Sequence, residues 1–168
     1  YITGVPRPGP GNLSGLDSSF AGMVLLGFHA MMGTPDGVLN HTQSSRSENR
    51  YWYNGVESGE IAQSAAIAGY YGIPVIMVTG DEATCREAHK FLGNNLVTVS
   101  TKKGLSREAA MLYPFEETHK ALYEGAKKAM GVIKSCKPYV LSSPIKVKMQ
   151  YLNLDKNLPK PELVTVEG

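Results

Sequence analysis

Three residues that can bind a metal ion or transfer protons, His29, His41 and Glu60, fall within one short run of this chain. Imidazole nitrogens and carboxylate oxygens are common zinc ligands, and both groups also act as general acids and bases. His29 directly follows an apolar segment, His41 lies in a polar loop, and Glu60 begins a segment of small residues. Side chains at element ends often face a cleft, so the run predicts a metal site or an acid–base site.

Each of these residues also has a purely structural interpretation. A histidine at a strand end can be a buried, hydrogen-bonded imidazole, and one in a polar loop can be a surface residue. A glutamate in the first turn of a helix is favourable through the helix dipole alone. The remaining histidines, His89 and His119, lie within expected helices. We interpret both as structural, with His119 on a half-buried or buried apolar face.

The elements expected around these residues describe an α/β fold, a layered sheet with parallel core strands flanked by helices. The apolar run over 21–28 is typical of a strand buried on both faces. Cap residues and helical apolar faces then predict helices over 58–71, 81–92 and 114–133, and apolar runs predict strands over 74–79 and 95–100. Ser58 and Asp81 are the expected N-caps of the first two helices, and Gly72 is expected to end the first.

Three further segments complete the predicted organisation. Asn54-Gly55, between aromatic and β-branched residues, predicts a hairpin. The loop over 30–49 is long enough to predict a functional role or contacts between subunits. Residues Ile145–Tyr151 alternate cleanly, which predicts a half-exposed strand at the sheet edge or in an added β unit. We therefore divide the chain into an α/β catalytic domain, 1–135, and a C-terminal β extension, 136–168.

Composition excludes several classes of function. With 42% hydrophobic and 19% charged residues, the chain is globular rather than disordered. Its net charge is only +2 and its basic residues are scattered, so nucleic acid is not an expected partner. No apolar run approaches the roughly 20 residues that span a bilayer, so we expect no membrane partner. Cys85 and Cys136 are far apart and fit no zinc knuckle, and such low cysteine usage predicts a cytoplasmic protein.

Other potential chemistry is weaker. The sequence contains neither a phosphate-binding GK[ST] loop nor the GxSxG motif of nucleophilic hydrolases. Lys102, Ser106 and Arg107 follow the third predicted strand in what reads as a loop. They can bind an anionic group, although their spacing favours a solvent-facing role. Asp81 is interpreted mainly as a helix cap, with a second possibility of a role near the site.

Several ordered motifs within about residues 1–135 closely resemble the zinc-dependent D-aminopeptidase family. Lys102 and Ser106-Arg107 match a further family pattern, Lys-x-x-x-Ser-Arg. The other motifs are Gly15-Leu-Asp-Ser-Ser-Phe-Ala-Gly, Leu26-Gly-Phe-His-Ala, Gly33-Thr-Pro, Asn40-His-Thr, Gly59-Glu and the segment from Ala68 to Asp81. The resemblance is specific because several unusual motifs agree in order and spacing.

The resemblance implies a metallo-aminopeptidase that uses zinc-activated water to release an N-terminal D-amino acid from short peptides or amino-acid amides. It implies two zinc ions per protomer and a ring-shaped homodecamer. By motif match, His29 and Glu60 are metal ligands and His41 is the catalytic histidine, whereas no substrate-binding residue is assigned.

Family members carry further ligands in an N-terminal Asp-x-Glu-Gly segment and in a downstream histidine, which have no counterpart in this sequence. We therefore expect a piece of a longer protein, with the N-terminal part of the catalytic domain missing and the C-terminal segment incomplete. Two alternatives remain at this point. One is a non-catalytic α/β binding or scaffold subunit, such as a degenerate or nicked relative, and the other is a metal-dependent amidase with another substrate.

Overall fold

The computed structural model describes residues 13, 15–151 and 164–166, and its centre is a mixed β-sheet. The strands lie in the order β1-β4-β5-β6. They are Met23–Leu25 (β1), Val75–Asp81 (β4), Val97–Ser106 (β5) and Ala109–Leu112 (β6). β1 and β5 run parallel to β4, and β6 returns antiparallel to β5.

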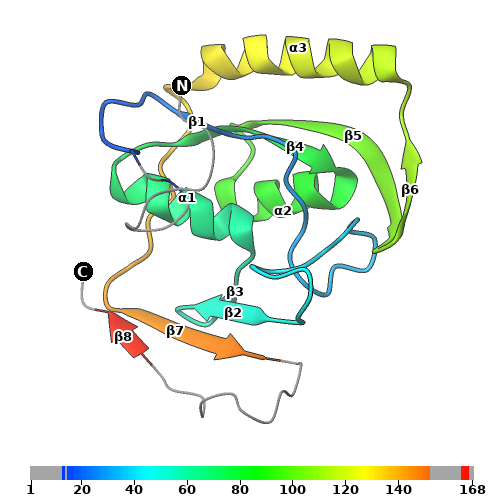
Figure 1. Cartoon of the computed structure of the whole chain (residues 1–168). Coiled ribbons are helices and arrows are strands. Elements are labelled where there is room, and N and C mark those ends of the chain that lie inside the picture. The colour runs from blue at the N-terminus through cyan, green and yellow to red at the C-terminus, as the bar shows by residue number, and fades with distance from the viewer. Residues whose placement is uncertain (1–12, 14, 152–163, 167–168) are drawn as a thin grey trace.

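Helices cover both faces of this sheet (Figure 1). Glu60–Tyr70 (α1) and Glu82–Leu92 (α2) lie on one face, and Phe115–Val132 (α3) lies on the other. Every residue of the central strand β4 is buried. Val78 of this strand, Ile61 of α1 and Ile73, which lies just before β4, are among the largest fully buried side chains. The predicted fold class, a layered sheet with parallel core strands flanked by helices, is confirmed.

The first strand differs from its prediction. β1 spans only three residues and is an edge strand within the described part of the chain. Val24 is 49% exposed and Leu26 is 70% exposed, so the expected burial on both faces is wrong. Continuous apolarity is typical of a central parallel strand, but the position of a strand in its sheet depends on distant partners.

Helix α3 also packs differently than its pattern predicts. His119 is exposed, so its prediction as a buried or half-buried residue of the helix is wrong. The helix buries only Gly125 and Ala129. A Cβ at Gly125 would lie 2.5 Å from Cγ2 of Val99 on β5, which shows how closely the backbone of α3 approaches the sheet. This narrow contact leaves Phe115 exposed beside His119, with ring centroids 6.0 Å apart.

A second, antiparallel sheet lies below the first in the order β3-β2-β7-β8 (Figure 1). The predicted hairpin is confirmed by Arg50–Tyr53 (β2) and Val56–Glu57 (β3), joined through Asn54 and Gly55, which both have positive φ. Ile145–Gln150 (β7) alternates in burial and pairs with β2, and Val164–Val166 (β8) pairs with β7. The C-terminal strand thus belongs to an added β unit, while the domain boundary near residue 135 stays a prediction.

The helix ends test the predicted caps. Asp81 caps α2, because its Oδ1 accepts the backbone N–H of Thr84 at 2.7 Å. Gly72 follows α1 with φ of +76°, as the αL position at a helix end requires. Ser58, however, does not cap α1: Gly59 is the N-cap, and the Ser58 hydroxyl donates to the carbonyl of Val56 instead.

Candidate metal and catalytic site

The end of strand β1, the loop after it and the start of helix α1 bring His29, His41 and Glu60 to one place. His29 follows β1 at its carboxyl end, where the Phe28 N–H donates to the carbonyl of Thr79 on β4 at 2.8 Å. Glu60 is the first residue of α1. The loop that carries His41 returns to the strand end, with the His41 N–H 3.4 Å from the carbonyl of Ala30. The three residues predicted from sequence are therefore brought together by the end of β1, the loop that follows it and the start of α1.

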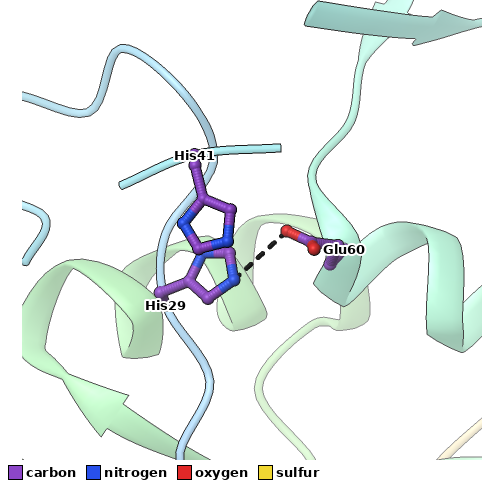
Figure 2. A group of neighbouring side chains, drawn as sticks. All are labelled: His29, His41 and Glu60. Atoms are coloured by element: carbon purple, nitrogen blue, oxygen red, sulfur yellow. Dashed lines mark ion pairs between the residues drawn. The ribbon is translucent and has the colours of Figure 1, made fainter. Parts of the chain in front are cut away.

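Their side chains form a compact group (Figure 2). One potential ligand atom from each residue lies within 4.8 Å of the other two. His29 Nε2 is 3.2 Å from Glu60 Oε2, and both side chains are 23% exposed. The two imidazoles are stacked, with centroids 3.7 Å apart and planes inclined by 17°. The group is thus partly shielded from water and still reachable from solvent.

The hydrogen bonds of the two rings orient their nitrogens. His29 Nδ1 lies 3.1 Å from the carbonyl oxygen of Ala30, and His41 Nδ1 lies 2.5 Å from that of Leu39. A carbonyl oxygen only accepts, so this pattern assigns the proton of each neutral ring to Nδ1. Nε2 of each histidine then carries a lone pair that is available to a metal or a proton.

This donor set fits a zinc ion. Glu60 Oε2 is buried and accepts no hydrogen bond from the described residues, so the carboxylate oxygen and His29 Nε2 face each other as two acceptors. A cation or a proton between them would satisfy both. Nitrogen and oxygen ligands lie about 2.0–2.2 Å from zinc, which places two ligands of one tetrahedral ion roughly 3.3 Å apart. The observed 3.2 Å separation matches that spacing.

Two buried carboxylates fix the loop between His29 and His41. Asp81 Oδ2 accepts the N–H of Val38 at 2.7 Å, in addition to capping α2. Glu87 Oε2 accepts the N–H of Met31, also at 2.7 Å. Glu87 was not identified from sequence, although an acidic residue beside Ala83 and Ala88 on the buried side of α2 is a signal that could have found it.

Burial raises the pKa of Glu87 to about 7, while the hydrogen bond from Met31 lowers it and the nearby charge of Glu60 raises it further. Its Oε1 is buried and has no hydrogen-bond partner in the described part of the chain. A Cβ at Gly59 would lie 2.7 Å from this oxygen and 2.6 Å from Cβ of Met31. The start of α1 can therefore approach these residues only because position 59 is glycine, and this approach positions Glu60.

Lys102, Ser106 and Arg107 do not form the loop predicted for them, because β5 continues through Ser106 and pairs with β6. Lys102 is half-buried within that strand. Arg107, in the turn, holds the loop around His41: its Nη2 donates to the carbonyl of Ser45 at 2.9 Å. Its Nε lies 3.4 Å from the carbonyl of Asn40 and its own carbonyl accepts the N–H of Leu39. A mainly solvent-facing role for Arg107 is therefore wrong.

Comparisons with known proteins agree on one family. The D-aminopeptidase family model, Peptidase_M55, matches residues 1–157. A D-aminopeptidase of Bacillus subtilis (strain 168) is 37% identical over 97 residues, which are 58% of this chain and 34% of that protein. A solved structure, Zn-dependent D-aminopeptidase DppA from Bacillus subtilis, a self-compartmentalizing protease, matches with a TM-score of 0.77 and 30% identity. That match covers 83% of this chain and 50% of the other, so the chain spans only a third to a half of these relatives.

Proposed function

Because this chain belongs to the D-aminopeptidase family, we propose that it is part of a zinc-dependent aminopeptidase that removes the N-terminal D-amino acid from short peptides or amino-acid amides. The observation that carries this proposal is the convergence of His29, His41 and Glu60, with an unsatisfied carboxylate oxygen facing an imidazole nitrogen. The match to a Zn-dependent D-aminopeptidase of known structure supports it.

In this proposal His29 Nε2 and the Glu60 carboxylate would hold the metal, which would lower the pKa of a water that it polarises and so ease the loss of a proton from that water at neutral pH. The Leu39 carbonyl keeps the proton of His41 on Nδ1, so Nε2 can take a proton from the attacking water and return it to the leaving amine. Asp81 and Glu87 hold the intervening loop in place while His41 acts.

We further propose two zinc ions per protomer in the intact enzyme. His29 and Glu60 supply two protein ligands, and two zinc ions need more than that, so the remaining ligands must come from outside the group of His29, His41 and Glu60. A ring-shaped homodecamer is proposed as the assembly, and the self-compartmentalizing protease among the matched structures supports an oligomer. A cytoplasmic location is proposed from cysteine usage, and Cys85 and Cys136 are both free. No helix among the described residues is long and apolar enough to cross a membrane.

The roles of the three residues are separable by measuring zinc content and turnover in the full-length protein. We expect His41→Ala to lower kcat for a D-alanyl peptide by about 100-fold or more while zinc content stays at the wild-type level. His29→Ala and Glu60→Ala should instead lose zinc, which elemental analysis by mass spectrometry would detect. His119→Ala is the matched control, because His119 is exposed on α3, and it should retain both properties.

Each alternative has a distinct outcome. Full activity in His41→Ala would remove His41 from the mechanism, and loss of zinc in that variant would make it a ligand. A full-length protein that binds no zinc would support a binding or scaffold subunit. Hydrolysis restricted to L-aminoacyl or non-peptide amides would indicate a metal-dependent amidase with a different substrate.

A further inference from the structure

A polar cavity of about 430 Å³ opens beside His41. It is lined by His41 and Met32, by loop residues 45–48 and by Arg107. Its volume falls within the range of about 300–1,000 Å³ that is common for small-molecule sites. Because the ring of His41 also stacks on His29, His41 connects this cavity with the candidate metal ligands.

The two arginines of the cavity differ in what they bind. The guanidinium of Arg107 is engaged by the carbonyls of Asn40 and Ser45 and by the carboxylate of Glu108, at 2.5 Å. The guanidinium of Arg46 is exposed and makes no hydrogen bond or ion pair with any residue in the described ranges. Arg107 thus stabilises the wall of the cavity, and Arg46 is the cation left available to a ligand.

We propose that this cavity is a binding site for the C-terminal carboxylate of a short peptide substrate, with Arg46 as its charged partner. The inference rests on the proposed function. His41 is the residue that returns a proton to the leaving amine, so the part of the substrate that leaves must lie on the His41 side of the metal ligands. In a dipeptide this part is a single amino acid, whose carboxylate would enter the cavity beside His41. A guanidinium is well suited to bind a carboxylate, because its donors form a planar fork.

Glu48 is the group in the cavity that opposes this assignment. It is exposed, lies two residues from Arg46, and forms no ion pair within the described residues. Its negative charge would repel a carboxylate and would attract the α-amine of a peptide. If the cavity binds a carboxylate, removing Arg46 should weaken substrate binding and removing Glu48 should not. If it binds the α-amine, the effects of the two changes should be reversed.

Two substrates that differ only at the C-terminus test the proposal, D-alanyl-D-alanine and its C-terminal amide, with the full-length zinc-loaded protein. We expect wild type to prefer the free acid, and Arg46→Gln to lower kcat/KM for the acid about tenfold while that for the amide changes less than about twofold. Glu48→Gln should preserve or increase the preference. Arg86→Gln is the matched control: Arg86 is also exposed and pairs with Asp36 of the same long loop, outside the cavity, so the preference should not change.

Several outcomes would overturn the inference without touching the proposed function. One is equal hydrolysis of acid and amide by wild type, and another is an equal loss for both substrates in Arg46→Gln. Loss of binding in Glu48→Gln alone would assign the cavity to the α-amine. If neither substrate is hydrolysed, the proposed function fails, and calorimetry with a non-hydrolysable dipeptide analogue and its amide still tests the cavity. Arg46→Lys, which keeps the charge, should retain part of the preference and shows that the position tolerates substitution.

Discussion

Charged residues lie on two sides of the His29, His41 and Glu60 group, and they are used differently. On the inner side, Asp81 is 1% exposed and Glu87 is 6% exposed, and each accepts a backbone N–H from the loop that leads to His41. On the outer side, Arg46 and Glu48 are exposed and have no ion-pair partner among residues 15–151. The inner carboxylates hold the loop, whereas the outer charges remain available to a ligand.

The difference follows from the cost of burying charge. A buried carboxylate is tolerated when hydrogen bonds replace its water, and both inner residues use loop amides for this purpose. Asp81 is fully satisfied, with the N–H and hydroxyl of Thr84 on one oxygen and the N–H of Val38 on the other. Glu87 is satisfied at one oxygen only. The inner side should therefore dominate stability, and the outer side should affect substrate use alone.

The largest expected effect is that of Asp81→Ala. Removing this side chain removes the cap of α2 and leaves the buried N–H of Thr84 and the half-buried N–H of Val38 without acceptors. We expect the free energy of unfolding to fall by roughly 2–4 kcal/mol in urea denaturation of the metal-free protein. Asp36→Ala is the control, because its ion pair with Arg86 is well exposed, and it should cost less than about 1 kcal/mol. Equal losses in the two variants would contradict the distinction between the two sides.

The second effect is a pH dependence due to Glu87. Burial raises its pKa from 4.5 to about 7, so between these values the folded protein keeps a proton that the unfolded chain releases. The free energy of unfolding should therefore decrease as pH rises through this window, by on the order of 3 kcal/mol in total, and Glu87 adds no further change above it. Below pH 4.5 the residue is protonated in both states and contributes no slope.

Glu87→Gln isolates this contribution. The glutamine of the variant cannot ionise. Wild type should therefore lose stability relative to the variant as pH rises from 5 to 8. Chemical denaturation of both metal-free proteins at several pH values measures this difference, and other titrating groups cancel in the comparison. A constant difference would mean that Glu87 is ionised throughout, and a difference of opposite sign would mean that its pKa is lowered.

Structural features that depend on neighbouring residues in the chain were predictable from sequence, and features that depend on distant residues were not. The hairpin at Asn54-Gly55 and the Asp81 cap were predicted correctly, because each is determined by residues within a few positions. The exposed outer face of β1 was not, since it depends on which strands lie beside it. Ser58 was predicted as a cap, but the tight approach to Met31 and Glu87 places the cap at Gly59.

The candidate site shows the same limit. His29, His41 and Glu60 were identified from their residue types and positions, and their motif match supplied the proposed roles. Their mutual distances depend on a loop that is held by side chains from β4 and α2. Glu87 escaped prediction because its partner Met31 lies 56 residues away in the chain. Such long-range hydrogen bonds leave no periodic pattern in the sequence, so only the structure reveals them.

The smallest expected effect is on the outer side, and it tests the comparison most sharply. Arg46→Gln and Glu48→Gln should each change the free energy of unfolding by less than about 0.5 kcal/mol, because both residues are exposed and neither side chain makes a hydrogen bond or ion pair with the described residues. Arg107→Gln in the same cavity should cost about 1–2 kcal/mol, since it removes hydrogen bonds to the carbonyls of Ser45 and Asn40. Thermal unfolding of the three variants side by side measures this contrast. A loss of more than 1 kcal/mol in Arg46→Gln would place Arg46 with the residues that hold the loop, and it would remove the reason for assigning its charge to a substrate carboxylate.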